Sequence, residues 1–250
     1  MKVRIAQLIV TKNISENTSK INSVLQSSVS GEWVMFPEGM ISGYSPEESD
    51  FLSKLDDNEI NDAIKNISKT VREKKINCLV GSALKNGDAW YNCSIIITSD
   101  KQLLYRKNNL STLDRNHFSA GNGLHIYEEN SLKFGVQMCR ELAFPEQWKA
   151  LKKNGAQVIF HINNAIKKSD KVREQVLVAR AFENQVWVCS VNNATSPQTM
   201  SSMIIDPLGN LIWKSIPQKE EVHVQELNMS LVSTQYLQQE RTDLVDVVLK

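Results

Sequence analysis

The chain of 250 residues has few of the features that mark a special class of protein. Its four cysteines are scattered, and no two of them form a C-x-x-C pair. We therefore expect no zinc framework, and a reducing compartment, the cytoplasm, as its location. No apolar run approaches the length of a membrane-spanning helix, and the first residues show no signal-peptide pattern, so we expect no membrane partner.

An excess of charge of one sign is also missing. The 29 basic residues nearly balance the 28 acidic ones, and no basic block occurs, so we expect no nucleic-acid partner. The sequence has no H-x-x-x-H motif, no cluster of cysteine and histidine, and no phosphate-binding loop, so we expect no metal and no cofactor. The apolar content of 41% and the charged content of 23% are ordinary for a globular protein.

Strand and helix patterns alternate along the chain. Short apolar runs predict strands at 3–10, 33–36, 78–83, 91–98, 102–105, 133–138, 157–162, 187–191, 203–205 and 211–214. Helical spacing of apolar residues appears at 21–25, 60–71 and 148–153. Val172, Val176 and Ala179 mark a further, long helix that ends near Asn184. No linker or repeat interrupts the pattern, which predicts one α/β domain spanning 1–250 with a sheet core and helices outside.

Three chemically distinctive residues follow three of the predicted strands. Cys139 ends the run 134–138, Glu38 follows 34–37, and Lys107 follows 103–106. Sites collect at the strand ends of α/β sheets. There, an ammonium lowers the pKa of a thiol and holds a developing oxyanion, while a carboxylate accepts and returns a proton. The alternative interpretation is a buried structural cysteine and a surface ion pair between Glu38 and Lys107.

Eight short segments resemble, in the right order, those of the carbon–nitrogen hydrolase (nitrilase) superfamily. Three carry its signature: Phe36-Pro37-Glu38-Gly39, Tyr105-Arg106-Lys107 and the run Cys139-Arg140-Glu141-Leu142-Ala143-Phe144-Pro145-Glu146. The other five are Arg4-Ile5-Ala6-Gln7, Gly43-Tyr44, Tyr91-Asn92, Arg180-Ala181-Phe182-Glu183-Asn184 and Ile205-Asp206-Pro207-Leu208-Gly209. The resemblance extends over nearly the whole chain.

This resemblance implies a four-layer α-β-β-α sandwich and a Glu–Lys–Cys catalytic triad. Glu38 is then the general base, Lys107 the cation beside the tetrahedral intermediate, and Cys139 the nucleophile. The expected activity is hydrolysis of a small carboxamide or N-carbamoyl compound through a thioester, with release of ammonia or an amine. The resemblance also implies pairing of two protomers, through helices near the nucleophile, into a homodimer.

The sequence departs from the family pattern at positions that bear on the substrate. Asp114 stands where many members have a second glutamate, so we expect it to be an auxiliary carboxylate near Lys107. Arg140 follows the nucleophile and is a candidate for reading a substrate carboxylate, or for an ion pair with Glu141.

The loop after 158–162 supplies further candidates for substrate contacts. Asn163 and Asn164 are the two that we expect to bind the substrate. For His161, at the end of the same strand, a role as a buried core histidine is the more expected one.

Three other functions remain to be compared with an amidase. A Cys–His enzyme built on Cys139 and His161 would leave Glu38 and Lys107 without a role. A catalytically silent binding protein on the same fold would not need an intact triad. Nitrile hydrolases share the triad but tend to be longer at the C-terminus, whereas this chain stops at Lys250.

Overall fold

The computed structural model describes residues 1–165 and 171–241. The strands are β1 (Lys2–Gln7), β2 (Trp33–Met35), β3 (Asn77–Asn86), β4 (Ala89–Ile97), β5 (Gln102–Arg106), β6 (Tyr127–Glu129), β7 (Leu132–Met138), β8 (Val158–Ile162), β9 (Trp187–Val191), β10 (Met203–Ile205), β11 (Leu211–Lys214) and β12 (Glu221–Glu226). The helices are α1 (Ile14–Gln26), α2 (Asp57–Lys74), α3 (Pro145–Lys153), α4 (Lys171–Asn184) and α5 (Gln235–Gln239). Short 3-10 helices are η1 (Leu52–Lys54), η2 (Asp114–Asn116), η3 (Cys139–Ala143) and η4 (Met229–Leu231).

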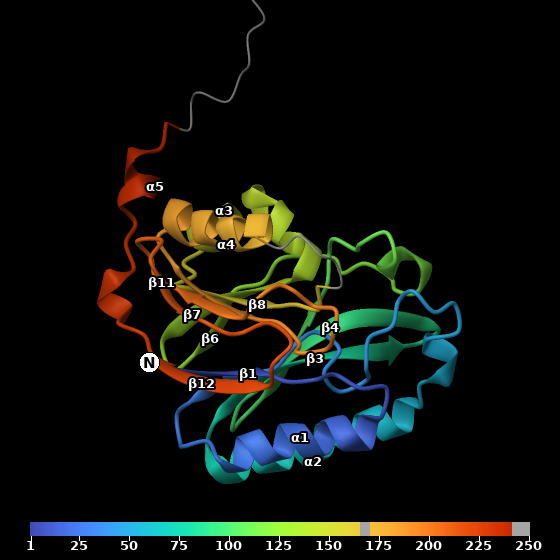
Figure 1. The fold of residues 1–250 in the computed structure, drawn as a ribbon. Coiled ribbons are helices and arrows are strands. Elements are labelled where there is room, and N and C mark those ends of the chain that lie inside the picture. The colour runs from blue at the N-terminus through green and yellow to red at the C-terminus, as the bar shows by residue number, and fades with distance from the viewer. Residues whose placement is uncertain (166–170, 242–250) are drawn as a thin grey trace, which may run out of the picture.

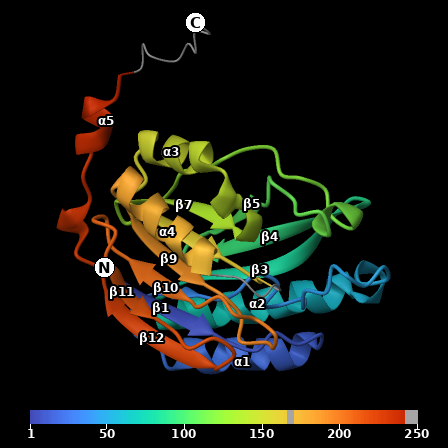
Figure 2. The same cartoon turned by 45° about the horizontal axis from the view of Figure 1, so that its top comes forward.

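The strands form two six-stranded sheets that pack face to face between two pairs of helices (Figure 1). The first sheet has the order β12-β1-β2-β3-β4-β5, and the second has the order β11-β10-β9-β8-β7-β6. Helices α1 and α2 cover the outer face of the first sheet, and α3 and α4 lie side by side over the second (Figure 2). This arrangement confirms the predicted α-β-β-α sandwich.

Three separate apolar clusters account for the layers. Ile21 and Ile64 of the first helix pair pack against the first sheet, whereas Trp148 and Leu177 of the second pair pack against the second sheet. Between the sheets, alternate residues of both, such as Phe160, form the central core. Successive side chains along a strand point to opposite faces of the sheet. A strand buried on both faces therefore contributes side chains to the cluster under the helices and to the cluster between the sheets.

The middle of each sheet is parallel. Strands β1, β2 and β3 run in the same direction, and so do β7, β8 and β9. In the second sheet the register places Gln137 beside His161, and His161 beside Ser190. Because parallel strands end at the same edge of a sheet, the loops that follow β7, β8 and β9 meet at one end of the sandwich.

The predicted strands all exist, but the sequence patterns missed two strands and one α-helix. Strands β6 and β12 and helix α5 were not predicted, because β6 and α5 are short and β12 has exposed valines at an edge. The predicted helix that ends near Asn184 is present as α4. Leu177 and Ala181 of α4 are buried in the core and Val176 packs against them, whereas Val172 is 65% exposed.

The helices of the described residues also bear on membrane association. None of them is both long enough and apolar enough to cross a membrane.

Candidate active site

The three strand-end residues and Asp114 meet in the interior of the sandwich. The Lys107 ammonium lies 2.8 Å from Glu38 Oε1 and 2.7 Å from Asp114 Oδ2. All three side chains have no exposed surface. A surface ion pair, the alternative interpretation of Glu38 and Lys107, is therefore excluded, and the predicted proximity of Asp114 to Lys107 is present.

Glu38 lies in the loop after β2, where the chain presses against β3. A Cβ on Gly81 would lie 2.6 Å from Glu38 Cα, so only glycine allows this approach. Asn92 Nδ2 donates to Glu38 Oε1 at 2.7 Å. Within the described part of the chain, the buried Oε2 atom has no hydrogen-bond partner. Glu38 thus keeps one acceptor oxygen for an incoming proton.

Burial and neighbouring charges set the protonation of this cluster. Burial raises the pKa of Glu38, although Lys107 opposes that shift. Burial also acts on Asp114, but the Lys107 ammonium and the hydroxyl of Tyr44, 2.6 Å from Oδ1, hold the pKa of Asp114 below its usual value. Burial disfavours the Lys107 ammonium, yet the anionic neighbours outweigh it and raise its pKa. Lys107 is therefore a permanent cation.

Cys139 occupies a sharp turn directly after β7. Its φ of 43° lies in the left-handed region, which residues with a side chain rarely adopt. Burial and the nearby Glu38 carboxylate raise the pKa of the Cys139 thiol to about 12, and Lys107 lowers it by less. Lys107 thus lowers the pKa of the thiol as expected, but burial and Glu38 together outweigh this effect.

Glu141 connects the nucleophile turn to the lysine segment, a role that the sequence did not reveal. One carboxylate oxygen accepts from the backbone N–H groups of Asn108 and Asn109, at 2.8 and 3.1 Å. The other accepts from the Met138 N–H at 2.8 Å, and the Tyr105 hydroxyl donates to both. Glu141 therefore positions the residues beside Lys107 and Cys139 together, and it forms no ion pair with Arg140 in the described structure.

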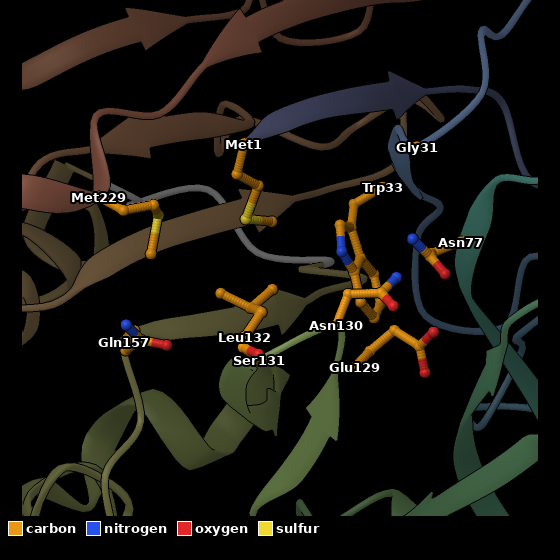
Figure 3. Close-up of a pocket in the computed structure, with 10 residues that line it drawn as sticks. All are labelled: Met1, Gly31, Trp33, Asn77, Glu129, Asn130, Ser131, Leu132, Gln157 and Met229. Atoms are coloured by element: carbon orange, nitrogen blue, oxygen red, sulfur yellow. The ribbon is translucent and has the colours of Figure 1, made fainter.

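A cavity of about 130 Å³ opens onto the nucleophile. It is lined by Tyr44, Pro46, Ser111, Thr112, Leu113, Cys139, Arg140, Asn164, Ala165 and Arg173. A larger cavity of about 370 Å³ lies elsewhere, around Trp33, Glu129 and Leu132 (Figure 3). Glu38, Lys107 and Cys139 do not line that larger cavity. Of these two cavities, the smaller one thus combines space with the Cys139 thiol.

The structure separates the candidates for substrate contacts. Arg140 is exposed and lines the cavity. Asn164 also lines the cavity but is buried, and its Nδ2 donates to the Glu38 carbonyl at 3.3 Å. Asn163 does not line the cavity. It is fully buried, and its Nδ2 contacts Met200 Sδ at 3.0 Å. Among the described residues, no group of three or more His, Cys, Asp or Glu side chains is arranged to hold a metal ion.

The sequence model of the carbon–nitrogen hydrolase family matches residues 2–236 of this chain. The chain belongs to the carbon–nitrogen hydrolase family.

Relatives of this carbon–nitrogen hydrolase agree with that assignment. A probable nitrilase of Schizosaccharomyces pombe is 29% identical over 85% of this chain and 81% of the relative. The 2-oxoglutaramate amidase of Bacillus subtilis is 29% identical over 79% of each chain. An amidase from Nesterenkonia sp. AN1, solved with acrylamide added at its active-site cysteine, superposes with a TM-score of 0.84 at 17% identity over 98% of both chains. That likeness shows the shared fold.

Three polar residues of the hydrolase site had no predicted role. Tyr44 and Asn92 lie in motif segments, and their side chains hydrogen-bond to Asp114 and Glu38. Glu141 lies in the nucleophile segment. The signal that pointed to all three was their place in the motifs. Their partners are distant in sequence, so no local pattern identified the bonds.

Alkylation should distinguish Cys139 from the other cysteines. All four thiols have raised pKa values, but Cys139 is half-buried and lines a cavity, whereas Cys78, Cys93 and Cys189 are fully buried. In folded protein at neutral pH, iodoacetamide should modify Cys139 first, as measured by peptide mass spectrometry. Earlier modification of any of the other three would contradict the assignment of the nucleophile.

The substitution Glu141→Gln should destabilise the fold by about 3 kcal/mol, because an amide nitrogen would face N–H donors that now share a carboxylate. Chemical denaturation measures the free energy of unfolding. The matched control is Glu128→Gln, since Glu128 is exposed and should change stability by less than about 0.5 kcal/mol. Equal stability of the two variants would show that Glu141 does not hold the turn.

Proposed function

We propose that this carbon–nitrogen hydrolase is a cysteine-dependent amidase that cleaves a small carboxamide or N-carbamoyl compound through a thioester. The observation that carries the proposal is the buried Lys107 ammonium between two carboxylates, next to a thiol that opens onto a cavity. A binding protein would have no use for a buried ion cluster that costs desolvation energy, whereas an oxyanion needs such a cation.

In the proposed first step, Cys139 Sγ attacks the carbonyl carbon while Glu38 takes the thiol proton on its free Oε2 atom. A thiol with a pKa of about 12 needs this base at the moment of attack. The carbonyl oxygen becomes an oxyanion, which accepts hydrogen bonds from Lys107 and from the backbone N–H of Arg140. Asp114 keeps Lys107 in place and protonated as the auxiliary carboxylate.

In the proposed second step, the C–N bond breaks and Glu38 returns its proton to the departing nitrogen. Ammonia or an amine leaves, and the acyl group remains on Cys139 as a thioester. Glu38 then takes a proton from water, which attacks the thioester carbon. The acid leaves, and the proton on Glu38 returns to the sulfur, so the site ends as it began.

The proposed substrate is an amide that carries a carboxylate. Two arginines, Arg140 and Arg173, line the cavity around Cys139, and none of the described residues that line it is acidic. A guanidinium binds a carboxylate through two parallel hydrogen bonds. The name of one relative, 2-oxoglutaramate amidase, describes an amide of an acid. Asn164 is proposed as a polar contact of the substrate, and a contact from Asn163 remains a prediction.

A homodimer and a single catalytic domain over 1–250 remain predictions as well. The outer face of α4 carries Phe182, which is 48% exposed and whose ring packs on Tyr236, and the exposed Val172. Such a dimer would cover these apolar side chains.

Release of ammonia tests the function directly. Wild-type protein should release ammonia from small carboxamides or N-carbamoyl compounds, and Cys139→Ala should abolish release while circular dichroism shows an intact fold. Cys189→Ala is the matched control, since this cysteine lies in the core between the sheets and does not line the cavity, so turnover should stay within about threefold of wild type. Binding of amides without turnover by wild type would indicate a silent binding protein, and faster turnover of matched nitriles would indicate a nitrile hydrolase.

The pH profile of kcat/KM on a neutral amide should report Glu38. Only its carboxylate form accepts the thiol proton, and burial raises its pKa, so activity should fall with decreasing pH at a value above 4.5. From about pH 7 to pH 9 the profile should be flat, because the thiol pKa is about 12. A rise over that interval would mean that Cys139 reacts as a pre-formed thiolate.

The substitution Arg140→Leu should raise KM for an acidic amide about tenfold more than KM for a neutral amide of the same size. Steady-state kinetics on the matched pair of substrates measures the difference. Arg115→Leu is the control, because Arg115 is exposed, lies near Asp114 in sequence and does not line the cavity. Equal changes of KM for both amides would leave Arg140 without a role in carboxylate recognition.

A further inference from the structure

His161 is a buried titratable residue that the proposed mechanism does not use. It lies on β8 with no exposed surface, between β7, which ends at the nucleophile, and β9. Its Nε2 atom lies 3.2 Å from the backbone carbonyl oxygen of Cys139, and its Nδ1 atom lies 2.8 Å from the hydroxyl of Ser190. Both ring nitrogens therefore have hydrogen-bond partners, and one of these partners is the backbone of Cys139.

These two partners determine the tautomer. A carbonyl oxygen can only accept a hydrogen bond, so Nε2 carries the hydrogen and donates to Cys139. Burial lowers the pKa of His161 to about 4, so the ring is neutral and Nδ1 accepts from the Ser190 hydroxyl. His161 has no free lone pair toward the thiol and cannot be its base, which excludes a Cys–His enzyme.

The bond to the Cys139 carbonyl determines the direction of a second group. The carbonyl of Cys139 and the N–H of Arg140 belong to one planar peptide and point in opposite directions. Arg140 is the second residue of η3, so no carbonyl within that helix reaches its N–H. Holding the carbonyl toward β8 therefore aims the Arg140 N–H away from the sheet.

We infer that His161, oriented by Ser190, is a positioning residue that holds the Cys139–Arg140 peptide so that its N–H donates to the oxyanion. This inference rests on the proposed amidase function. Cys139 has a positive φ, and a turn of this kind has no regular ladder to hold its next peptide. Glu141 holds the backbone before the nucleophile through the Met138 N–H, and His161 holds the backbone after it.

Two substitutions of His161 test the inference, because they place the same amide group at the end of a longer or a shorter side chain. In His161→Gln, the longer amide can still donate to the Cys139 carbonyl, so kcat should stay within about fivefold of wild type. In His161→Asn, the shorter amide reaches only toward Ser190, so kcat should fall about a hundredfold with KM changed less than about threefold, as for loss of an oxyanion donor. Thermal unfolding of both variants checks that they fold.

Alkylation of Cys139 by iodoacetamide shows whether a loss of activity comes from a misplaced Cys139–Arg140 peptide or from a misplaced thiol. This displacement reaction forms no tetrahedral oxyanion, so His161→Asn should alkylate Cys139 at a rate within about twofold of wild type. Parallel loss of alkylation and turnover would mean that His161 only supports the structure, which overturns the inference. Equal kcat in the Gln and Asn variants would overturn it as well.

A third variant keeps the test valid if His161→Asn does not fold. Ser190→Ala retains the imidazole but removes the hydroxyl that orients it, so kcat should fall about threefold to tenfold with alkylation unchanged. An unchanged kcat in Ser190→Ala would then contradict the inference. A wild-type protein that alkylates at Cys139 but hydrolyses no amide refutes the proposed function itself, and the positioning role with it.

Discussion

The site depends on one buried ammonium. Lys107 has no exposed surface, and a charge removed from water in this way is stable only with close counter-charges and hydrogen bonds. Glu38 and Asp114 supply them from two different loops, and each carboxylate has a further donor in Asn92 or Tyr44. Four segments of the chain must therefore adopt their final positions before this charge is satisfied.

The same cluster explains why the two carboxylates behave differently. Asp114 accepts hydrogen bonds on both oxygens, and its pKa is lowered. Glu38 keeps one oxygen without a partner among the described residues, and its pKa is raised. Asp114 is thus the more strongly anionic partner of Lys107, and Glu38 is the carboxylate to which the proposed mechanism gives proton transfer. Their surroundings, rather than the one methylene that distinguishes Asp from Glu, separate the two roles.

Apolar periodicity and turn residues are local signals, and they predicted the alternating strands and helices and the residues at the strand ends. The four layers were implied only by the resemblance to the carbon–nitrogen hydrolase superfamily. Cys139 and Lys107 each follow their strand directly, as expected. The spacing of apolar residues predicted helix α4, but only packing determines which of its residues enter the core. Lys107 lowers the thiol pKa as expected, but the larger effect of burial depends on the whole fold and could not be read from the sequence. The hydrogen bonds of Glu141 and His161 join segments distant in sequence, so no local pattern contains them.

The division of the site between the two sheets has a consequence for the chain during its synthesis. Glu38 and Lys107 come from loops of the first sheet, whereas Cys139 ends β7 of the second. A chain in which only one sheet has formed carries an ordinary thiol without its base, or a base without a thiol. In the proposed mechanism, reactivity therefore requires that the two sheets have docked.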